Sequence, residues 1–147
     1  MEFVTFELAQ KLKEKGFSCK YPFAMYDECG KFHPLYTSAD YYKAPSGFEY
    51  RCYYDFDDFN DKDTCCPTIE QVLRWLRKEH NLYVCPTQEA YRGNRKKDKS
   101  YNLWMFQVKN IANNHLIYPK PLDLHDVYEI YEQAAIAGIE FVIDNLI

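Results

Sequence analysis

The sequence contains no long hydrophobic run and no N-terminal export signal. No window approaches the roughly 18 consecutive apolar residues that a membrane-spanning helix needs. The opening segment, MEFVTFELAQ, carries an acid at its second position, and no apolar segment typical of a signal peptide follows it. We therefore expect no membrane partner and a cytoplasmic location, in which the six cysteines are reduced thiols.

An excess of basic residues is also missing. The chain has 18 Lys and Arg against 22 Asp and Glu, which gives a formal net charge of -4 and a pI near 5.6. General binding to nucleic-acid phosphates requires a basic face. The overall charge therefore argues against such binding, although a local basic patch remains compatible with it.

Familiar catalytic motifs are absent. The sequence has no G-x-S-x-G, P-loop, G-x-G-x-x-G or H-E-x-x-H pattern. Its histidines are scattered, and we interpret each as a surface residue: His33, His80, His115 and His125. We therefore favour a protein that is not an enzyme and that uses no cofactor. An enzyme whose site is assembled from distant positions is the last of three alternatives, after the binding of a protein and the binding of a nucleic acid, which are discussed below.

Two neighbouring cysteines, Cys65 and Cys66, precede a helix start in DTCCPTIEQVLRW. A thiol at a helix N-terminus can have a lowered pKa and become reactive. A thiol nucleophile also needs a base, however, and no histidine is close in the sequence. The nearby Asp61 and Asp63 oppose a thiolate, so we interpret both cysteines as small packing residues.

Metal sites also lack their usual spacing. Cys29 and His33 form the only ligand-like pair, and no C-x2-C pair accompanies them. The acidic run DFDDFNDKD, residues 55–63, does not fit a calcium-binding EF-hand loop, because a start at Asp57 places Phe59 at the third position. We expect no bound metal, and we interpret the acidic run as a solvated loop.

Tyrosine is the abundant residue, with 14 copies against 2 tryptophans. Its apolar ring and polar tip suit half-buried sheets and contact surfaces. Residues 38–63 mix tyrosines with turn residues and acids and read as a long loop, although EYRCYYDF within it can form one more strand. We expect a protein partner to bind through the tyrosine pairs of this segment: Tyr41, Tyr42, Tyr53 and Tyr54.

A basic run, RGNRKKDK, suggests nucleic acid as the alternative partner. Its five cations stand against one acid, Asp98, which leaves a local charge of +4: Arg92, Arg95, Lys96, Lys97 and Lys99. Nearby aromatic residues suit nucleic-acid binding. The predicted order α-β-β-β-α in the second half is that of the double-stranded RNA-binding fold. The matching second helix, YEQAAIAG, lacks the lysines that this family uses, and a solvated hairpin tip is the plainer interpretation.

Residue patterns predict three helices and at least five strands. Helical stripes and end signals mark helices over 5–15, 68–80 and 131–146, the second with a Thr68–Gln71 capping box and the third with a buried stripe that ends at Leu146. Aromatic runs around Asp27–Gly30 predict a hairpin. Strands are also predicted over 82–88, 101–110 and 115–121, with a polar loop at 89–100.

The element order is therefore α-β-β-(β)-α-β-β-β-α. Because hairpins dominate and no βαβ repeat is evident, we predict an α+β fold with helices packed on one face of a mostly antiparallel sheet. We expect a single domain over 1–147, with subdomains 1–63 and 64–147 as an alternative division. An exposed strand edge is compatible with a homodimer.

Three segments, 7–42, 66–84 and 131–147, carry a resemblance to other proteins. ELAQKLKEKGFSCKYPFAMYDECGKFHPLYTSADYY, CPTIEQVLRWLRKEHNLYV and YEQAAIAGIEFVIDNLI resemble a family of short uncharacterised proteins from gut bacteria and their phage-like mobile elements. The resemblance implies a bacterial, intracellular setting. It implies no activity, and no functional residue can be transferred from it.

Overall fold

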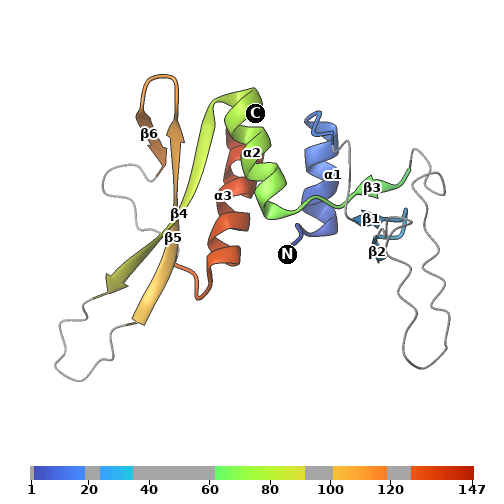
Figure 1. Ribbon diagram of the computed structural model, residues 1–147, viewed down its shortest axis with the longest axis horizontal. Helices are drawn as coiled ribbons and strands as arrows, with labels where there is room; N and C mark the ends of the chain where they lie inside the picture. The colour runs from blue at the N-terminus through green and yellow to red at the C-terminus, as the bar shows by residue number, and fades with distance from the viewer. Residues whose placement is uncertain (1, 19–23, 35–61, 92–100, 119–126) are drawn as a thin grey trace, which may run out of the picture. The chain divides into compact units, whose positions relative to one another are not determined.

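The computed structural model describes residues 2–18, 24–34, 62–91, 101–118 and 127–147 (Figure 1). In these ranges the chain has three helices and two antiparallel sheets, which confirms the predicted α+β class. The chain forms two compact units, one over Phe3–Thr68 and one over Ile69–Ile147, and each is described separately. The assignment of the whole chain to a single domain stays a prediction. No helix in the described ranges is long and apolar enough to cross a bilayer.

The first unit begins with helix α1 (Phe6–Glu14). The Thr5 hydroxyl caps it by accepting a hydrogen bond from the Leu8 N–H at 3.3 Å. Gly16 adopts φ 85°, and the Phe17 N–H then donates to the Leu12 carbonyl at 2.9 Å. This is the glycine-terminated helix end that the sequence predicts.

A small sheet follows, in the order β2-β1-β3, with all pairs antiparallel. Strands β1 (Ala24–Tyr26) and β2 (Phe32–Pro34) form the predicted hairpin, and Pro34 lies on the edge strand as its missing N–H requires. Strand β3 (Thr64–Cys65) was not expected, because two residues offer no alternation to detect. Cys65 is therefore a strand residue and does not belong to the segment that directly precedes the next helix.

One face of this sheet packs against α1. The Tyr26 and Phe6 rings meet edge to face at 5.4 Å, and the Tyr26 hydroxyl donates to the Val4 carbonyl at 2.8 Å. Gly30, at φ 80°, passes so close to Phe6 that a Cβ there would lie 2.7 Å from the ring. Cys66 is fully buried among these residues. The core of the first unit therefore lies between α1 and this sheet face.

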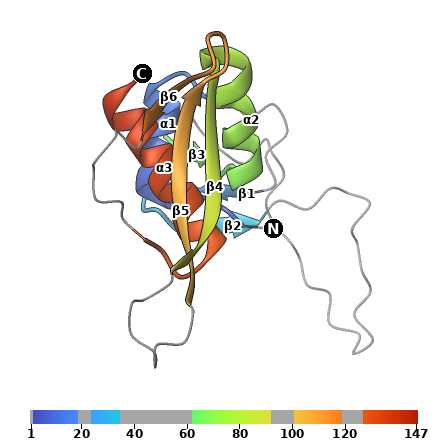
Figure 2. The ribbon, with the colours of Figure 1, turned by 90° about the vertical axis from the view of Figure 1, so that its left-hand side faces the viewer.

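The second unit has the order α2 (Ile69–His80), β4 (Leu82–Tyr91), β5 (Tyr101–Asn110), β6 (His115–Tyr118) and α3 (Tyr131–Asn145). Its strands form one antiparallel sheet, β4-β5-β6, and both helices lie on the same side of it (Figures 1 and 2). This confirms the predicted α-β-β-β-α order. Strand β4 runs three residues further than predicted, because Glu89–Tyr91 pair with the start of β5.

The core of the second unit lies between the two helices and one sheet face. Helix α2 buries the predicted stripe: Ile69, Val72, Leu73 and Leu76. In α3 the predicted packing reason for Gly138 is confirmed, since a Cβ there would lie 2.5 Å from the Val84 side chain and 3.1 Å from the Phe106 ring. The prediction that Leu146 is buried is wrong, because it caps the helix end and is 37% exposed.

Candidate functional site

Both predicted binding segments lie outside the residues that the structure describes. This applies to the tyrosines Tyr41, Tyr42, Tyr53 and Tyr54 and to the basic set Arg92, Arg95, Lys96, Lys97 and Lys99. The structure does show where the basic set is attached. The β4–β5 register runs to the pair Tyr91↔Tyr101, so residues 92–100 join the ends of two paired strands, as expected. His125 also lies outside the described ranges.

The two neighbouring cysteines have different surroundings, and neither lies at a helix N-terminus. Cys66 is fully buried, and its thiol donates to the Val4 carbonyl at 3.9 Å. Burial raises the pKa of the Cys66 thiol to about 11, so it stays protonated and unreactive at neutral pH. Cys65, half-buried in β3, pairs with Met25 of β1. Cys66 thus behaves as the packing residue that the sequence predicts.

The ligand-like residues do not meet at one point. Met25 pairs with His33 on one side and with Cys65 on the other, so these three form a row on the sheet face opposite α1. His33 and Cys65 are therefore two strand spacings apart, about 10 Å. The Met25 strand position separates them in this row. No group of three His, Cys, Asp or Glu suited to a metal occurs among the described residues.

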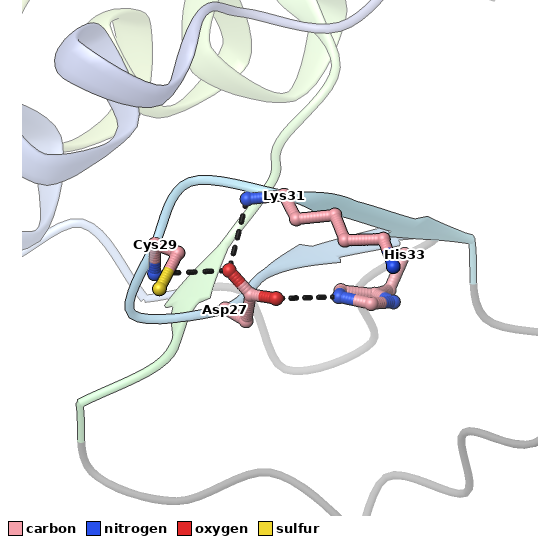
Figure 3. A network of polar contacts seen from close by, with 4 residues as sticks. All are labelled: Asp27, Cys29, Lys31 and His33. Atoms are coloured by element: carbon pink, nitrogen blue, oxygen red, sulfur yellow. Dashed lines mark hydrogen bonds and ion pairs between the residues drawn. The ribbon is translucent and has the colours of Figure 1, made fainter.

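A compact polar centre occupies the β1–β2 hairpin (Figure 3). One carboxylate oxygen of Asp27 accepts backbone hydrogen bonds from Cys29 and Lys31, both at 2.9 Å. Its other oxygen lies 2.9 Å from Nε2 of His33. Asp27 and His33 are diagonal neighbours across the two strands and lie on the same sheet face. The side chain of Asp27 therefore fixes both the turn and the imidazole.

The electrostatics of this pair follow from these bonds. The hydrogen bond from His33, followed by the backbone N–H groups of Lys31 and Cys29, holds the pKa of Asp27 below its ordinary value. His33 is only 6% exposed, so its assignment as a surface histidine is wrong. The informative sequence signal was an acid and a histidine six positions apart across the predicted hairpin turn. That signal becomes readable only once the hairpin register is known.

An imidazole oriented by a carboxylate is also the arrangement that positions a catalytic base. Such a base needs a nucleophile within hydrogen-bond reach. Figure 3 shows the Asp27 carboxylate between Cys29 and His33, so the thiol nearest in sequence does not face the imidazole. The Asp27–His33 pair is therefore best explained as a device that holds the hairpin together.

The second candidate is a surface on the β4–β5–β6 sheet, opposite the helices. The register pairs Tyr83 with Lys109 and Lys109 with Leu116, so these three side chains form one row across three strands. Val84, one residue from Tyr83, faces Gly138 of α3, so alternation directs the row to the other face. Ile111, in the turn directly after β5, is also exposed. We name these four residues the Tyr83–Leu116 patch.

Three members of the patch are apolar and exposed, and the patch also carries positive charge. Tyr83 is 37% exposed, Leu116 41% and Ile111 48%. The Arg77 guanidinium of α2 lies 5.9 Å from the centre of the Tyr83 ring, within the range of a cation–π contact. A hydrogen bond with the Cys85 thiol is the main cause that raises the pKa of Tyr83, so this tyrosine stays neutral.

The patch has a definite limit along the sheet. Met105 lies on the same face two rows away, and it is only 6% exposed. The exposed apolar surface is therefore confined to the end of the sheet near the β5–β6 turn. The sequence did not predict the patch, because its members come from different strands and only the strand register brings them together. The tyrosine-rich segment favoured a binding site in residues 38–63 instead.

The chain was also compared with known proteins. No family model matches it, and neither a curated protein nor a solved structure is similar to it.

Proposed function

We propose that this is a non-enzymatic binding protein whose partner is another protein. The observation that carries the proposal is the Tyr83–Leu116 patch, in which three large exposed apolar side chains accompany Lys109 at one end of the sheet. Protein interfaces are enriched in aromatic residues, and exposed apolar patches of this kind mark contact sites. The tyrosines predicted at 41, 42, 53 and 54 extend the same proposal to a second contact region.

Aliphatic side chains favour a protein over a nucleic acid at this patch. Leu116 and Ile111 offer no flat ring for a base to stack on, whereas nucleic-acid surfaces combine aromatic platforms with several cations. The overall charge of -4 also repels a polyphosphate. We further propose the cytoplasm of a bacterial cell as the setting, because three segments of the chain resemble short proteins of gut bacteria.

Nucleic-acid binding through residues 92–99 is the second candidate, and the topology of the second unit favours it. The order α2-β4-β5-β6-α3 has both helices on one sheet face, and the basic run joins β4 to β5. The start of α3 opposes it, because Glu132 lies in the first turn and Glu129 precedes it. A helix start with this charge repels phosphate where the RNA-binding family offers lysines.

The proposed function is tested by affinity purification from cells that express the protein, with quantitative mass spectrometry. The bait is compared with a triple variant, Tyr83→Ser, Ile111→Ser and Leu116→Ser, and with Leu146→Ser as a matched control. Leu146 is as exposed as Tyr83 but lies at the end of α3. We expect a partner that the wild type and the control capture and that the triple variant loses.

Retention of every captured protein by the triple variant would contradict the use of this patch. Circular dichroism spectra should not change, because all three side chains are exposed and their replacement leaves the core intact. Capture of nuclease-sensitive material in place of a protein would favour the second candidate.

A further inference from the structure

The arrangement of charge around the Tyr83–Leu116 patch restricts the chemistry of its partner. Lys109 stands at the centre of the row, between Tyr83 on one strand and Leu116 on the other. Arg77 lies over the tyrosine ring at one end. The apolar side chains are therefore interleaved with two cations over a short distance.

These cations differ in how far they are already neutralised. Arg77 lies 3.2 Å from Glu70 in a partly exposed ion pair. Lys109 is half-buried, and no carboxylate of the described ranges lies within ion-pair distance of it. A half-buried cation between apolar side chains is poorly compensated, so an incoming carboxylate gains more here than at a fully solvated lysine.

We propose that the Tyr83–Leu116 patch binds an acidic protein segment, one that carries apolar side chains next to carboxylates. Its apolar side chains lie on Tyr83, Leu116 and Ile111, and its carboxylates pair with Lys109 and Arg77. This rests on the proposed function and adds to it the chemical class of the partner.

Other occupants fit the patch less well. A second copy of this chain in a two-fold symmetric contact brings the same patch against itself, so Lys109 of one copy meets Lys109 of the other. Like charges at the centre of an interface disfavour that contact. A polyphosphate can pair with the two cations, but it makes no favourable contact with the aliphatic side chains of Ile111 and Leu116.

The test is a selection from a display library of random peptides on the immobilised full chain. Peptides that also bind the triple variant, Tyr83→Ser, Ile111→Ser and Leu116→Ser, are removed in each round. We expect the enriched peptides to combine apolar residues with an excess of Asp and Glu.

Charge variants then test the contact with Lys109. For an enriched peptide we expect Lys109→Glu to raise Kd about tenfold or more, because a favourable contact becomes a repulsive one. The matched control is Lys31→Glu, the same charge change on the exposed β1–β2 turn, which should leave Kd within about twofold. Added salt should weaken the wild-type complex more than the Lys109→Glu complex, because in the variant salt also screens the new repulsion.

The possible results separate the two levels of the proposal. Enriched peptides that need the patch but carry no acidic excess, or that ignore Lys109→Glu, overturn the acidic partner and leave protein binding in place. If no peptide distinguishes the wild type from the triple variant, the patch is not a protein-binding site and both proposals fail. Binding of a random-sequence RNA oligonucleotide that Lys109→Glu abolishes, with no peptide enriched, identifies a nucleic-acid surface and also overturns the inference.

Discussion

Replacing Gly138 by alanine sets helix propensity against packing, and the structure predicts that packing dominates. Alanine is favoured over glycine within a helix by about 1 kcal/mol. In α3, however, the new Cβ would lie 2.5 Å from Cγ1 of Val84 and 3.1 Å from the Phe106 ring. Val84 is only 4% exposed and has a stiff branched side chain, so it cannot move aside cheaply.

The magnitude follows from these opposing effects. Overpacking of a close-packed core costs about 1–3 kcal/mol, which exceeds the gain in propensity. We therefore expect Gly138→Ala to lower the free energy of unfolding by roughly 1 kcal/mol. Val84→Ala alone should cost roughly 2 kcal/mol, from two buried methyl groups and the cavity they leave. In the double variant the closest of these contacts, the one with Val84, is gone, so the two effects should be coupled by roughly 1 kcal/mol.

The assay is urea unfolding followed by tryptophan fluorescence. Both tryptophans, Trp75 and Trp104, belong to the second unit, so their signal reports the unit that contains Gly138. If Gly138→Ala instead stabilises the protein and shows no coupling to Val84→Ala, the close approach of α3 to β4 is wrong. A stabilised variant would show that only propensity acts at this position.

Two further predictions concern the first unit. Because the pKa of Asp27 is lowered in the folded state, its ionised form contributes stability above the unfolded pKa of about 3.9, and this is lost as the pH falls through the folded value. Urea midpoints followed by far-UV circular dichroism should therefore decline less steeply below about pH 4 in Asp27→Asn than in the wild type, and parallel curves would contradict the His33 pairing. For the thiols, labelling of the native protein read by mass spectrometry should modify the exposed Cys29 early and the buried Cys66 last among the four cysteines of the described ranges. Early labelling of Cys66 would contradict its burial.

Elements with a clear period were predictable from the sequence alone. Helix α2 follows from apolar residues at helical spacing, and β5 (Tyr101–Asn110) has the bounds that its aromatic and apolar run predicts. The packing role of Gly138 was also predictable. Glycine within a helix lowers its stability relative to alanine, so a close packing contact is the expected explanation for it. Strand β3 was not, since two residues acquire a strand conformation only by pairing with β1.

The candidate sites depend on register, which a single sequence does not reveal. Asp27 and His33 meet because the register of the hairpin places them diagonally across its two strands. The Tyr83–Leu116 patch depends on a bulge between Val108 and Lys109, which pairs Lys109 with Leu116. A regular ladder continued from the pair Val108↔Tyr118 would place Ile117 opposite Lys109 and turn Leu116 to the other face.

The most direct test of the central claim places a photo-crosslinking amino acid at position 116 of the full chain, in cells that express it. The control carries the same amino acid at position 146, which is similarly exposed but lies at the end of α3. We expect a discrete crosslinked protein from position 116 and none of it from position 146. Equal products from both positions, or none from position 116, would contradict the assignment of the Tyr83–Leu116 patch as a protein-binding surface.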